Sequence, residues 1–230
     1  LRKVMLEHTY EHRLAYVLSK ALGRRMQSRM PPMLVVAVAQ TADECGKLID
    51  NFRRQSYSAK RLLLVASPGV CPDEAHALNN DAIIRVDTVE QASARVAALA
   101  STASWLAAMV PTDYYGPNYL LDLAVATRYS EGDVVGKAGY YRFDGGVRLV
   151  DAERAYQSAE RLGQRCSAIR LAALSEEQLT NSAWLYNLAD ESWERAGLAL
   201  DTFNYCRDGM SSADVQEMST RVDDLDLDTG

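Results

Sequence analysis

The pattern of apolar and polar residues along the chain predicts alternating strands and helices. Continuous runs of aliphatic, often β-branched residues occupy positions 33–39, 61–66, 81–86 and 104–110, and such runs are typical of strands that are buried on both faces. Between these strands, helical spacing of apolar residues predicts helices over 41–55 and 89–102. The alternation predicts an α/β fold with a mostly parallel, doubly wound sheet, in which ligands bind at the carboxyl ends of the strands.

The segment before this unit has a different pattern. Residues 1–30 are typical of a basic amphipathic helix that ends at Pro31 and Pro32. Its apolar stripe consists of Leu6, Tyr10, Leu14, Val17, Leu18 and Leu22. Because a lone helix cannot bury such a stripe, we expect it to contact another domain or a second copy of the chain, or to fold back on its own sheet. Since the sequence begins with Leu1, we also expect a chain excised or processed from a longer one.

The last segment, residues 210–230, is polar and acidic. Its final stretch, DLDLDTG, resembles a calcium-binding loop but lacks the central glycine and the terminal glutamate of such loops. A disordered acidic tail is therefore favoured over a calcium site. We divide the chain into a helical arm (1–30), an α/β domain (31–209) and this tail.

Composition and charge exclude several classes of function. The 230 residues are 48% hydrophobic and 24% charged, which is typical of a globular domain, and the formal net charge is −6. Nucleic-acid binding depends on clustered basic residues, so we expect no nucleic-acid partner. No apolar run approaches the roughly 20 residues that span a bilayer, so we expect no transmembrane segment and a cytoplasmic protein.

Cysteine and histidine residues are few and scattered. Cys45, Cys71, Cys166 and Cys206 form no C-x-x-C pair, which predicts free, mostly buried thiols and a reducing compartment. The three histidines, His8, His12 and His76, are too dispersed for a zinc site. His8 and His12 are spaced to share a metal on one helix face, but their charged neighbours favour a solvated face.

One stretch, MVPTDYYGPNYLLDL at 109–123, joins the end of a predicted strand to a helix. Asp113 at this junction could hold a metal, bind a sugar hydroxyl or cap the helix ahead of Pro117, and the cap is the most economical of the three. Tyr114, Tyr115 and Tyr119 could stack on sugar rings, but at such a junction tyrosines more often fill the core.

Several stretches together resemble the family 2 inverting glycosyltransferases, which have the GT-A fold. They are DYYGPNYLLDL at 113–123, DVVGKAGYY at 133–141 and TFNYCR at 202–207, in the order found in that family. The resemblance runs from about residue 33 to 207. It implies an α/β domain of GT-A type that transfers a sugar from a nucleotide-sugar donor to a glycan or other acceptor.

The resemblance also implies three acidic stations. A D-x-D motif after the fourth strand holds a divalent metal, which neutralises the nucleoside diphosphate leaving group. An acidic pair after the second strand holds the nucleoside, and a further carboxylate at the start of a later helix acts as the general base.

This sequence departs from the family pattern at each station. After the second strand the acidic pair is replaced by the uncharged stretch 66–69, and Val110 and Pro111 replace acidic members of the D-x-D region, so that only Asp113 is left. Where the general base is expected, Asn181 and Ala183 align. All three departures remove charge from positions that the family uses for binding or chemistry.

A fourth departure introduces a cation. An asparagine that the family carries in the helix before the fourth strand is replaced by Arg95. We expect Arg95 to face the strand ends near Asp113, as an ion pair or an anion site in place of the metal.

The resemblance places the remaining contacts residue by residue. The predicted nucleotide-sugar contacts are Gln40, Thr41, Ser67, Arg95, Thr112 and Asp113. The predicted sugar or acceptor stacking residues are Tyr114, Tyr115 and Trp184, and Trp184 and Trp193 are expected on opposed faces.

The same resemblance sets the expectations for catalysis and metal. Asp190 and Glu191 are weak candidates for the base, and no metal is expected, with Asp113 the ligand if there is one. These departures favour a glycosyltransferase-like domain of polysaccharide biosynthesis with impaired or lost catalysis. The alternative is an active inverting enzyme with a metal-poor site, which would use Mn²⁺ or Mg²⁺ if it used metal at all.

Overall fold

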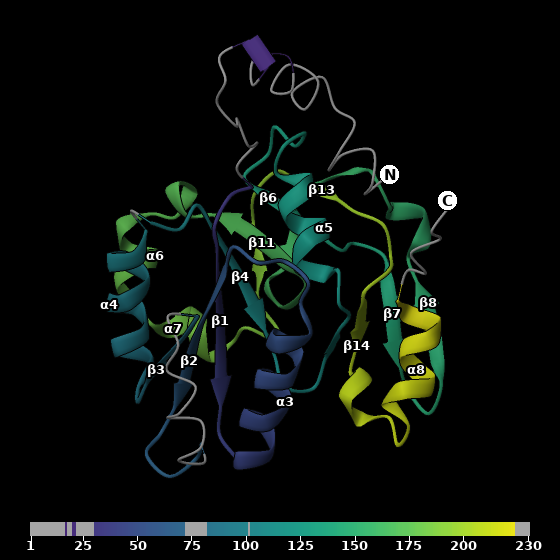
Figure 1. Cartoon of the computed structure of the whole chain (residues 1–230), viewed down its shortest axis with the longest axis horizontal. Coiled ribbons are helices and arrows are strands. Elements are labelled where there is room, and N and C mark those ends of the chain that lie inside the picture. The colour runs from purple at the N-terminus through teal and green to yellow at the C-terminus, as the bar shows by residue number, and fades with distance from the viewer. Residues whose placement is uncertain (1–16, 18–19, 22–29, 72–81, 101, 224–230) are drawn as a thin grey trace.

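The computed structural model describes residues 17, 20–21, 30–71, 82–100 and 102–223, and within them a central sheet of eight strands. The strand order is β3-β2-β1-β4-β11-β6-β13-β9 (Figure 1). The strands are β1 (Met33–Ala39), β2 (Lys60–Ala66), β3 (Ile83–Val86), β4 (Trp105–Met109), β6 (Val134–Gly136), β9 (Ser158–Ala159), β11 (Ser167–Arg170) and β13 (Gly197–Ala199).

Strand directions in this sheet are mixed, with parallel pairs in the majority. The pairs β1–β2, β1–β4, β2–β3 and β6–β13 are parallel. Strand β11 runs antiparallel to both β4 and β6, and β9 runs antiparallel to β13. The predicted strands at 33–39, 61–66, 81–86 and 104–110 therefore form the parallel half of the sheet, and the predicted α/β class is confirmed.

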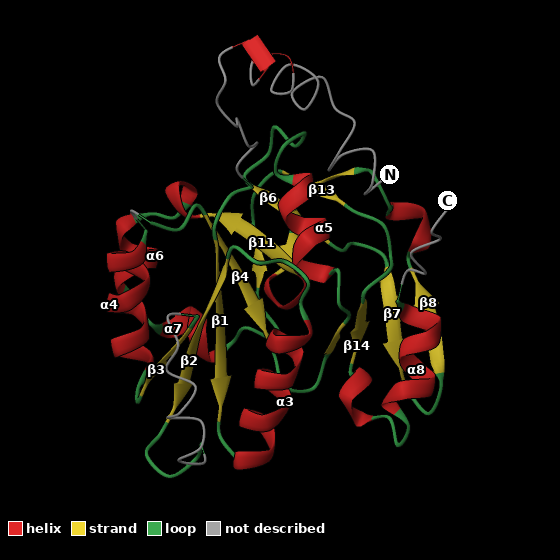
Figure 2. Ribbon diagram, in the orientation of Figure 1, coloured by secondary structure: helices red, strands yellow, loops and turns green. Residues whose placement is uncertain are grey.

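Helices cover both faces of the sheet (Figure 2). The α-helices are α3 (Ala42–Arg54), α4 (Val89–Leu99), α5 (Tyr119–Ala126), α6 (Glu176–Thr180), α7 (Ala183–Tyr186) and α8 (Val215–Val222). Short 3-10 helices are η2 (Ala152–Arg154), η3 (Gln164–Cys166), η4 (Leu171–Ala173) and η5 (Gly209–Ser211).

The side chains of β1 alternate between two separate apolar cores. Val35 and Ala37 pack in one core with residues of α3 and α5, and Leu34 and Val36 pack in the other with residues of α4 and α7. Both faces of β1 are thus covered, which explains why its sequence is continuously apolar. The helices begin where the sequence provides caps, since the Thr41 side chain accepts a hydrogen bond from Glu44 N at the start of α3.

A second sheet extends the molecule beyond the predicted unit. It has the order β5-β14-β7-β8, with β5 (Tyr114–Tyr115), β14 (Tyr205–Arg207), β7 (Tyr140–Phe143) and β8 (Val147–Val150). A two-stranded sheet pairs β10 (Leu162–Gly163) with β12 (Ser192–Trp193). Strand β5 lies inside the 109–123 stretch, so this stretch links the central sheet to the second one.

Helix α8 packs against the second sheet (Figure 1). Its residues Met218 and Val222 are buried in a small core with Tyr114 and Cys206. The segment predicted only as a polar, acidic tail from residue 210 therefore includes a partly buried helix, Val215–Val222. The stretch 224–230 lies outside the described residues.

The prediction of four free thiols is wrong for one pair. Cys45 on α3 and Cys71, in the loop after β2, form a disulfide, while Cys166 and Cys206 are free and buried. The chain does not show this pairing as a local motif because the two cysteines are 26 positions apart. The bond ties the end of β2 to the helix that follows β1.

The N-terminal arm and the membrane expectation can be placed only in part. Most of residues 1–30, His8 and His12 included, lies outside the described residues, as does His76; Val17, which is described, is exposed. Within the described part of the chain, none of the helices has the length and apolar character needed to cross a bilayer.

Candidate functional site

The carboxyl ends of the parallel strands bring all of the predicted nucleotide-sugar contacts except Arg95 to one edge of the sheet. Gln40 and Thr41 follow β1, Ser67 follows β2, and Thr112 and Asp113 follow β4. The register supports this, because Ala39 pairs with Ala66 and Ala37 pairs with Met109. At such an edge α/β proteins bind their ligands.

Two of these positions are engaged in local contacts. The Thr41 side chain caps α3, and the Gln40 N–H donates to the Glu44 carboxylate at 2.7 Å. Beyond β2, the Arg85 guanidinium donates to the backbone carbonyl of Ser67 at 3.2 Å. The uncharged turn after β2 thus has a neighbouring cation that the sequence did not single out.

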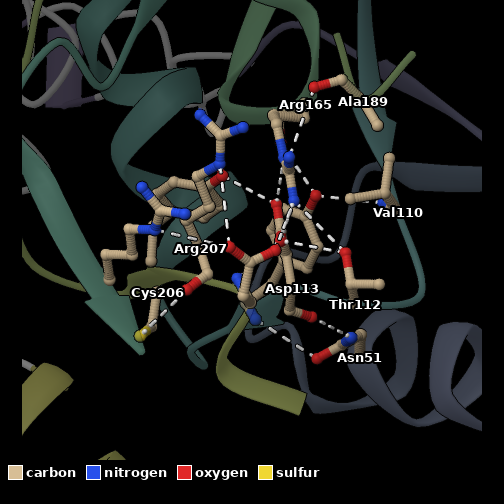
Figure 3. Close-up of polar contacts among 12 residues, drawn as sticks. Asn51, Val110, Thr112, Asp113, Arg165, Ala189, Cys206 and Arg207 are labelled. Atoms are coloured by element: carbon tan, nitrogen blue, oxygen red, sulfur yellow. Dashed lines mark hydrogen bonds and ion pairs between the residues drawn. The ribbon is translucent and has the colours of Figure 1, made fainter. Parts of the chain in front are cut away.

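Asp113 is the most constrained residue of this edge. Its side chain is fully buried and faces the Arg165 guanidinium, as Figure 3 shows. Arg165 Nε donates to Oδ2 at 2.7 Å, Arg165 Nη2 donates to Oδ1, and the Tyr205 hydroxyl donates to Oδ2 at 2.7 Å. The backbone N–H of Asp208 donates to Oδ1 at 2.9 Å. Both carboxylate oxygens are therefore saturated by donors from this chain.

Arg165 is positioned as firmly as its partner. It lies in η3, between β10 and β11, and is buried. Its Nη1 donates to the Ala189 carbonyl at 3.3 Å, and its Nη2 donates to Thr112 Oγ1 at 3.2 Å and to Asp208 Oδ1 at 3.3 Å. Burial, the largest single effect, lowers the pKa of this guanidinium, but hydrogen bonding to Asp113 together with the charge interactions of Tyr205, Asp113 and Tyr115 outweighs burial and raises the pKa above its usual value. Arg165 is a permanent cation at this site.

Asp208, whose backbone N–H donates to the Asp113 carboxylate, adopts an uncommon backbone conformation. Asp208 has a φ of 59°, in the left-handed region, directly after β14. The Cβ atom makes this region costly for residues other than glycine, and aspartate tolerates it better than most. The resulting turn brings the Asp208 N–H onto the Asp113 carboxylate.

Two expectations for Asp113 are wrong. It is not the cap of the following helix, because α5 begins after Asn118, which forms no side-chain cap bond. Nor is Arg95 its cation. Arg95 lies exposed on α4, which packs against α6, α7, β2 and β3, while the ion pair of Asp113 is formed by Arg165.

Sequence reasoning missed Arg165, and one weak signal could have indicated it. Arg165 directly precedes the apolar stretch CSAI, where a lone cation must find a buried partner. This signal does not identify the partner, because 52 positions separate the two residues in the sequence.

A layer of polar contacts beneath the ion pair fixes the strand-to-helix junction. Asn51 Nδ2 donates to the Asp113 carbonyl at 2.9 Å, and Asn51 Oδ1 accepts from the Tyr115 N–H at 3.2 Å. The Tyr115 hydroxyl donates to the Arg165 carbonyl at 2.8 Å. The same tyrosine accepts from the Val110 N–H at 3.0 Å. This network fixes the backbone of both Asp113 and Arg165 and so positions the ion pair.

The tyrosines of the junction belong to the core. Tyr115 and Tyr119 are 0% exposed and Tyr114 is 2% exposed, so none offers a ring face to a sugar. Tyr114 instead donates its hydroxyl to Asp223 at 2.7 Å and lies under the Arg54 guanidinium. The core alternative holds for all three.

Gly116 in the G-P pair is required by close packing. A Cβ at this position would lie 2.2 Å from Asp223 Oδ1 and 3.0 Å from Asn204 Cα. The entry to β14 and the end of α8 therefore approach the backbone more closely than any side chain allows.

The site offers few groups to a divalent metal. Asp113 has no free lone pair directed away from Arg165, Tyr205 and Asp208, and Val110 and Pro111 have no side-chain oxygen. Among the residues that the structure describes, no group of three or more histidine, cysteine or acidic side chains is arranged to hold a metal. The donor set next to β4 suits an anion better than a cation.

A cavity of about 240 Å³ opens beside the ion pair. Its basic lining residues are Lys137, Arg154, Arg161, Arg165 and Arg207. Its acidic lining residues are Asp151, Asp190 and Glu191. Asp190 and Glu191, the two candidates for the base, are thus brought to the same cavity as Arg165.

Several of these charges are paired within the chain. Lys137 Nζ lies 2.8 Å from Asp201 and Arg154 Nη1 lies 3.9 Å from Asp151. Arg207 Nε is buried, forms no hydrogen bond and lies 3.9 Å from Asp208 Oδ2. The cavity therefore presents the exposed carboxylates of Asp190 and Glu191 to a ligand, with arginines beside them.

Trp184 lies away from this cavity, in α7. Its indole donates to the Gln178 carbonyl at 2.9 Å, and its ring centroid is 5.8 Å from that of Trp193. The two tryptophans therefore contact one another, and the expectation that they lie on opposed faces is wrong. Asn181 and Ala183 lie beside them, exposed, and the Asn181 side chain accepts from the Ala183 N–H.

Comparison with known proteins gives similarity at the level of solved structures. No protein-family model and no curated protein matches the chain. The crystal structure of residues 1–349 of S. aureus TarS in complex with UDP-GlcNAc superposes with a TM-score of 0.47 and 14% identity, over 83% of this chain and 64% of that one. Another crystal structure of S. aureus TarS 1–349 gives a TM-score of 0.46 and 12% identity, over 77% of this chain and 60% of that one. The chain thus spans less than two thirds of these proteins, and at such scores neither similarity assigns it a family.

Proposed function

We propose that this chain is a glycosyltransferase-like domain of GT-A type that recognises sugar ligands and in which metal-dependent sugar transfer is impaired or lost. One observation carries the proposal. Asp113 is the only acidic residue left in the region that resembles the D-x-D motif, and it is buried and paired with Arg165. The sequence resemblance from 33 to 207 and the α/β topology support the class. A nucleotide sugar and a glycan acceptor are the ligands that this class implies.

The physical reason lies in the competition between Arg165 and a metal ion. A divalent cation would have to displace a guanidinium that is held by Asp113, Asp208, Thr112 and the Ala189 carbonyl. Displacement would leave a buried cation without its partners, which costs several kcal/mol. A single carboxylate does not compensate such a cost for a hard cation.

A second function is favoured by the same residue. Arg165 places a permanent positive charge at the carboxyl end of β4, and Asp190 and Glu191 line the adjacent cavity. A guanidinium can stabilise the charge that develops on a diphosphate leaving group, and a carboxylate can accept the proton of an acceptor hydroxyl. An active inverting transferase without metal is therefore the alternative.

Calorimetric titration separates the two. The full chain is titrated with UDP-, GDP- and dTDP-sugars, with and without MnCl₂, and the product nucleotide is measured after long incubation with water as acceptor. We expect weak or no donor binding, no gain from Mn²⁺ and no released nucleotide. Metal-dependent binding in the micromolar range, about −8 kcal/mol, would overturn the proposal. Metal-independent nucleotide release that Arg165→Lys removes would establish the alternative.

A further inference from the structure

A second cavity, of about 400 Å³ and open to solvent, is lined mainly by residues of α6, α7, β12 and the chain beside them. It is separate from the Asp113 ion pair, but Glu191 and Ser192 line both this cavity and the one beside Arg165. A ligand that fills it would thus reach the edge of the first cavity. None of the predicted nucleotide-sugar contacts lines it.

Two tryptophans form its apolar wall. Trp193 in β12 is buried and Trp184 in α7 is half-buried, with their ring centroids 5.8 Å apart at 52°. The Trp184 indole N–H is already bonded to the Gln178 carbonyl, which fixes the orientation of the ring. Aromatic rings at this exposure pack on the C–H faces of sugars while leaving the hydroxyl groups to polar neighbours.

Two buried polar atoms at this wall lack partners. Trp193 Nε1, a donor, and Gln164 Oε1, an acceptor, have no hydrogen bond in the structure, and both residues line the cavity. The side chains are buried, at 5% and 4% exposure. An unpaired buried polar group costs about 1–3 kcal/mol. Both atoms are closed off from solvent, so a ligand hydroxyl, which both donates and accepts, satisfies either of them only if the lining side chains move.

The charge of the lining selects against anions. Three glutamates, Glu177, Glu191 and Glu194, stand against one cation, Arg195. The remaining polar residues are uncharged: Gln164, Gln178, Asn181, Asn187 and Ser192. Carboxylates accept from hydroxyl groups and amides both accept and donate, whereas phosphate or a uronic acid would be repelled by the carboxylates.

We propose that this cavity binds a neutral, hydroxyl-rich ligand of the sugar class. The inference rests on the proposed sugar recognition by the domain, and it assigns the recognition to a place distinct from the strand edge. The ligand packs a ring on Trp184, bonds Glu177 and the amides through its hydroxyl groups, and approaches Glu191 at the border of the first cavity.

The test uses no nucleotide and no metal, so its failure is distinguishable from failure of the proposed function. Saturation-transfer NMR is recorded on the full chain with cellobiose, maltose and N-acetylglucosamine, and with glucuronate as the anionic comparator. Trp184→Ala and Glu177→Gln alter the cavity. Tyr186→Ala and Glu176→Gln change neighbouring residues of the same two helices that do not line it.

We expect transfer to at least one neutral sugar and none to glucuronate. Trp184→Ala should abolish it, Glu177→Gln should weaken affinity at least fivefold, and the two control variants should match the parent chain. Absence of transfer at millimolar sugar, about −4 kcal/mol or weaker, overturns the proposal, as does binding that Glu177→Gln and Trp184→Ala leave unchanged. If Trp184→Ala does not fold, Glu177→Gln, whose side chain is at the surface, decides the outcome.

Discussion

Arg165 Nε lies 2.7 Å from Oδ2 of Asp113, and the two residues come from segments 52 positions apart. The pair joins the carboxyl end of β4 to the turn between β10 and β11. Because the Asp208 N–H and the Tyr205 hydroxyl bond the same carboxylate, the pair also connects the central sheet to the four-stranded sheet that contains β14. A cation that belongs to the chain thus occupies the carboxylate that would otherwise be free for a metal.

The first prediction concerns the stability of this pair. Arg165→Met should lower the free energy of unfolding by about 3–5 kcal/mol, because it leaves a buried carboxylate without its cation. Urea denaturation of the parent and the variant measures the difference.

The double variant Asp113→Asn/Arg165→Met supplies the control. With both charges removed, we expect it to recover a substantial part of the loss. Equal destabilisation in the single and double variants would mean that shape, and not charge, determines the cost.

The sequence predicted the parallel half of the sheet because its strands are long and continuously apolar. Strands β1, β2 and β4 appear within a residue or two of the expected bounds. Strands such as β5, β10 and β12 have two residues each, so periodicity could not indicate them. The second sheet, built partly from such pieces, was therefore absent from the expectation.

The sequence identified residues of the site only where the local pattern around one residue was sufficient. Asp113 was singled out because a lone carboxylate follows an apolar strand, but its partner depends on tertiary folding. Arg95 was expected in that role since it differed from the family pattern, and the structure places it exposed on α4. A substitution pattern identifies an unusual position, but it does not give the direction of the side chain.

The second prediction counts thiols. In the native chain neither Cys166 nor Cys206 should react with a thiol reagent at pH 8, since both are buried and burial raises the pKa of each thiol to about 12. Unfolding without reductant should expose these two groups, and reduction should expose Cys45 and Cys71 as well. Titration with a chromogenic disulfide reagent measures each state. Four reactive groups before reduction would show that the disulfide is absent.

The third prediction is a loss of stability at high pH. The pKa of Cys166 is raised by burial from 9.0 to about 12 in the folded chain. As pH rises above 9, the unfolded chain releases this proton and the folded chain keeps it, so stability is full below that pH and falls by roughly 1.4 kcal/mol per pH unit toward pH 12.

Urea unfolding between pH 8 and 11 tests this dependence. Cys166→Ala removes the thiol, so the free energy of unfolding of this variant should fall less steeply with pH, by the contribution of about one proton. Parallel curves for the parent and Cys166→Ala would assign the alkaline loss to other groups, such as the buried tyrosines.

The last prediction tests where the domain ends. Met218 is 3% exposed and Val222 is 0% exposed, and both pack from α8 against Tyr114 and Cys206. Met218→Ala should therefore lower the free energy of unfolding by about 2–5 kcal/mol, as for other truncations of buried side chains. Val215→Ala, at a half-buried position of the same helix, should cost less. Thermal or urea unfolding of these variants, and of a chain ending at Gly209, measures the contribution. If the shortened chain and Met218→Ala both unfold like the parent, then α8 is an accessory to a domain that ends at Gly209. A marked loss of stability in both makes α8 part of the fold that supports Asp113, because α8 packs on Tyr114, the residue that follows Asp113 in the chain.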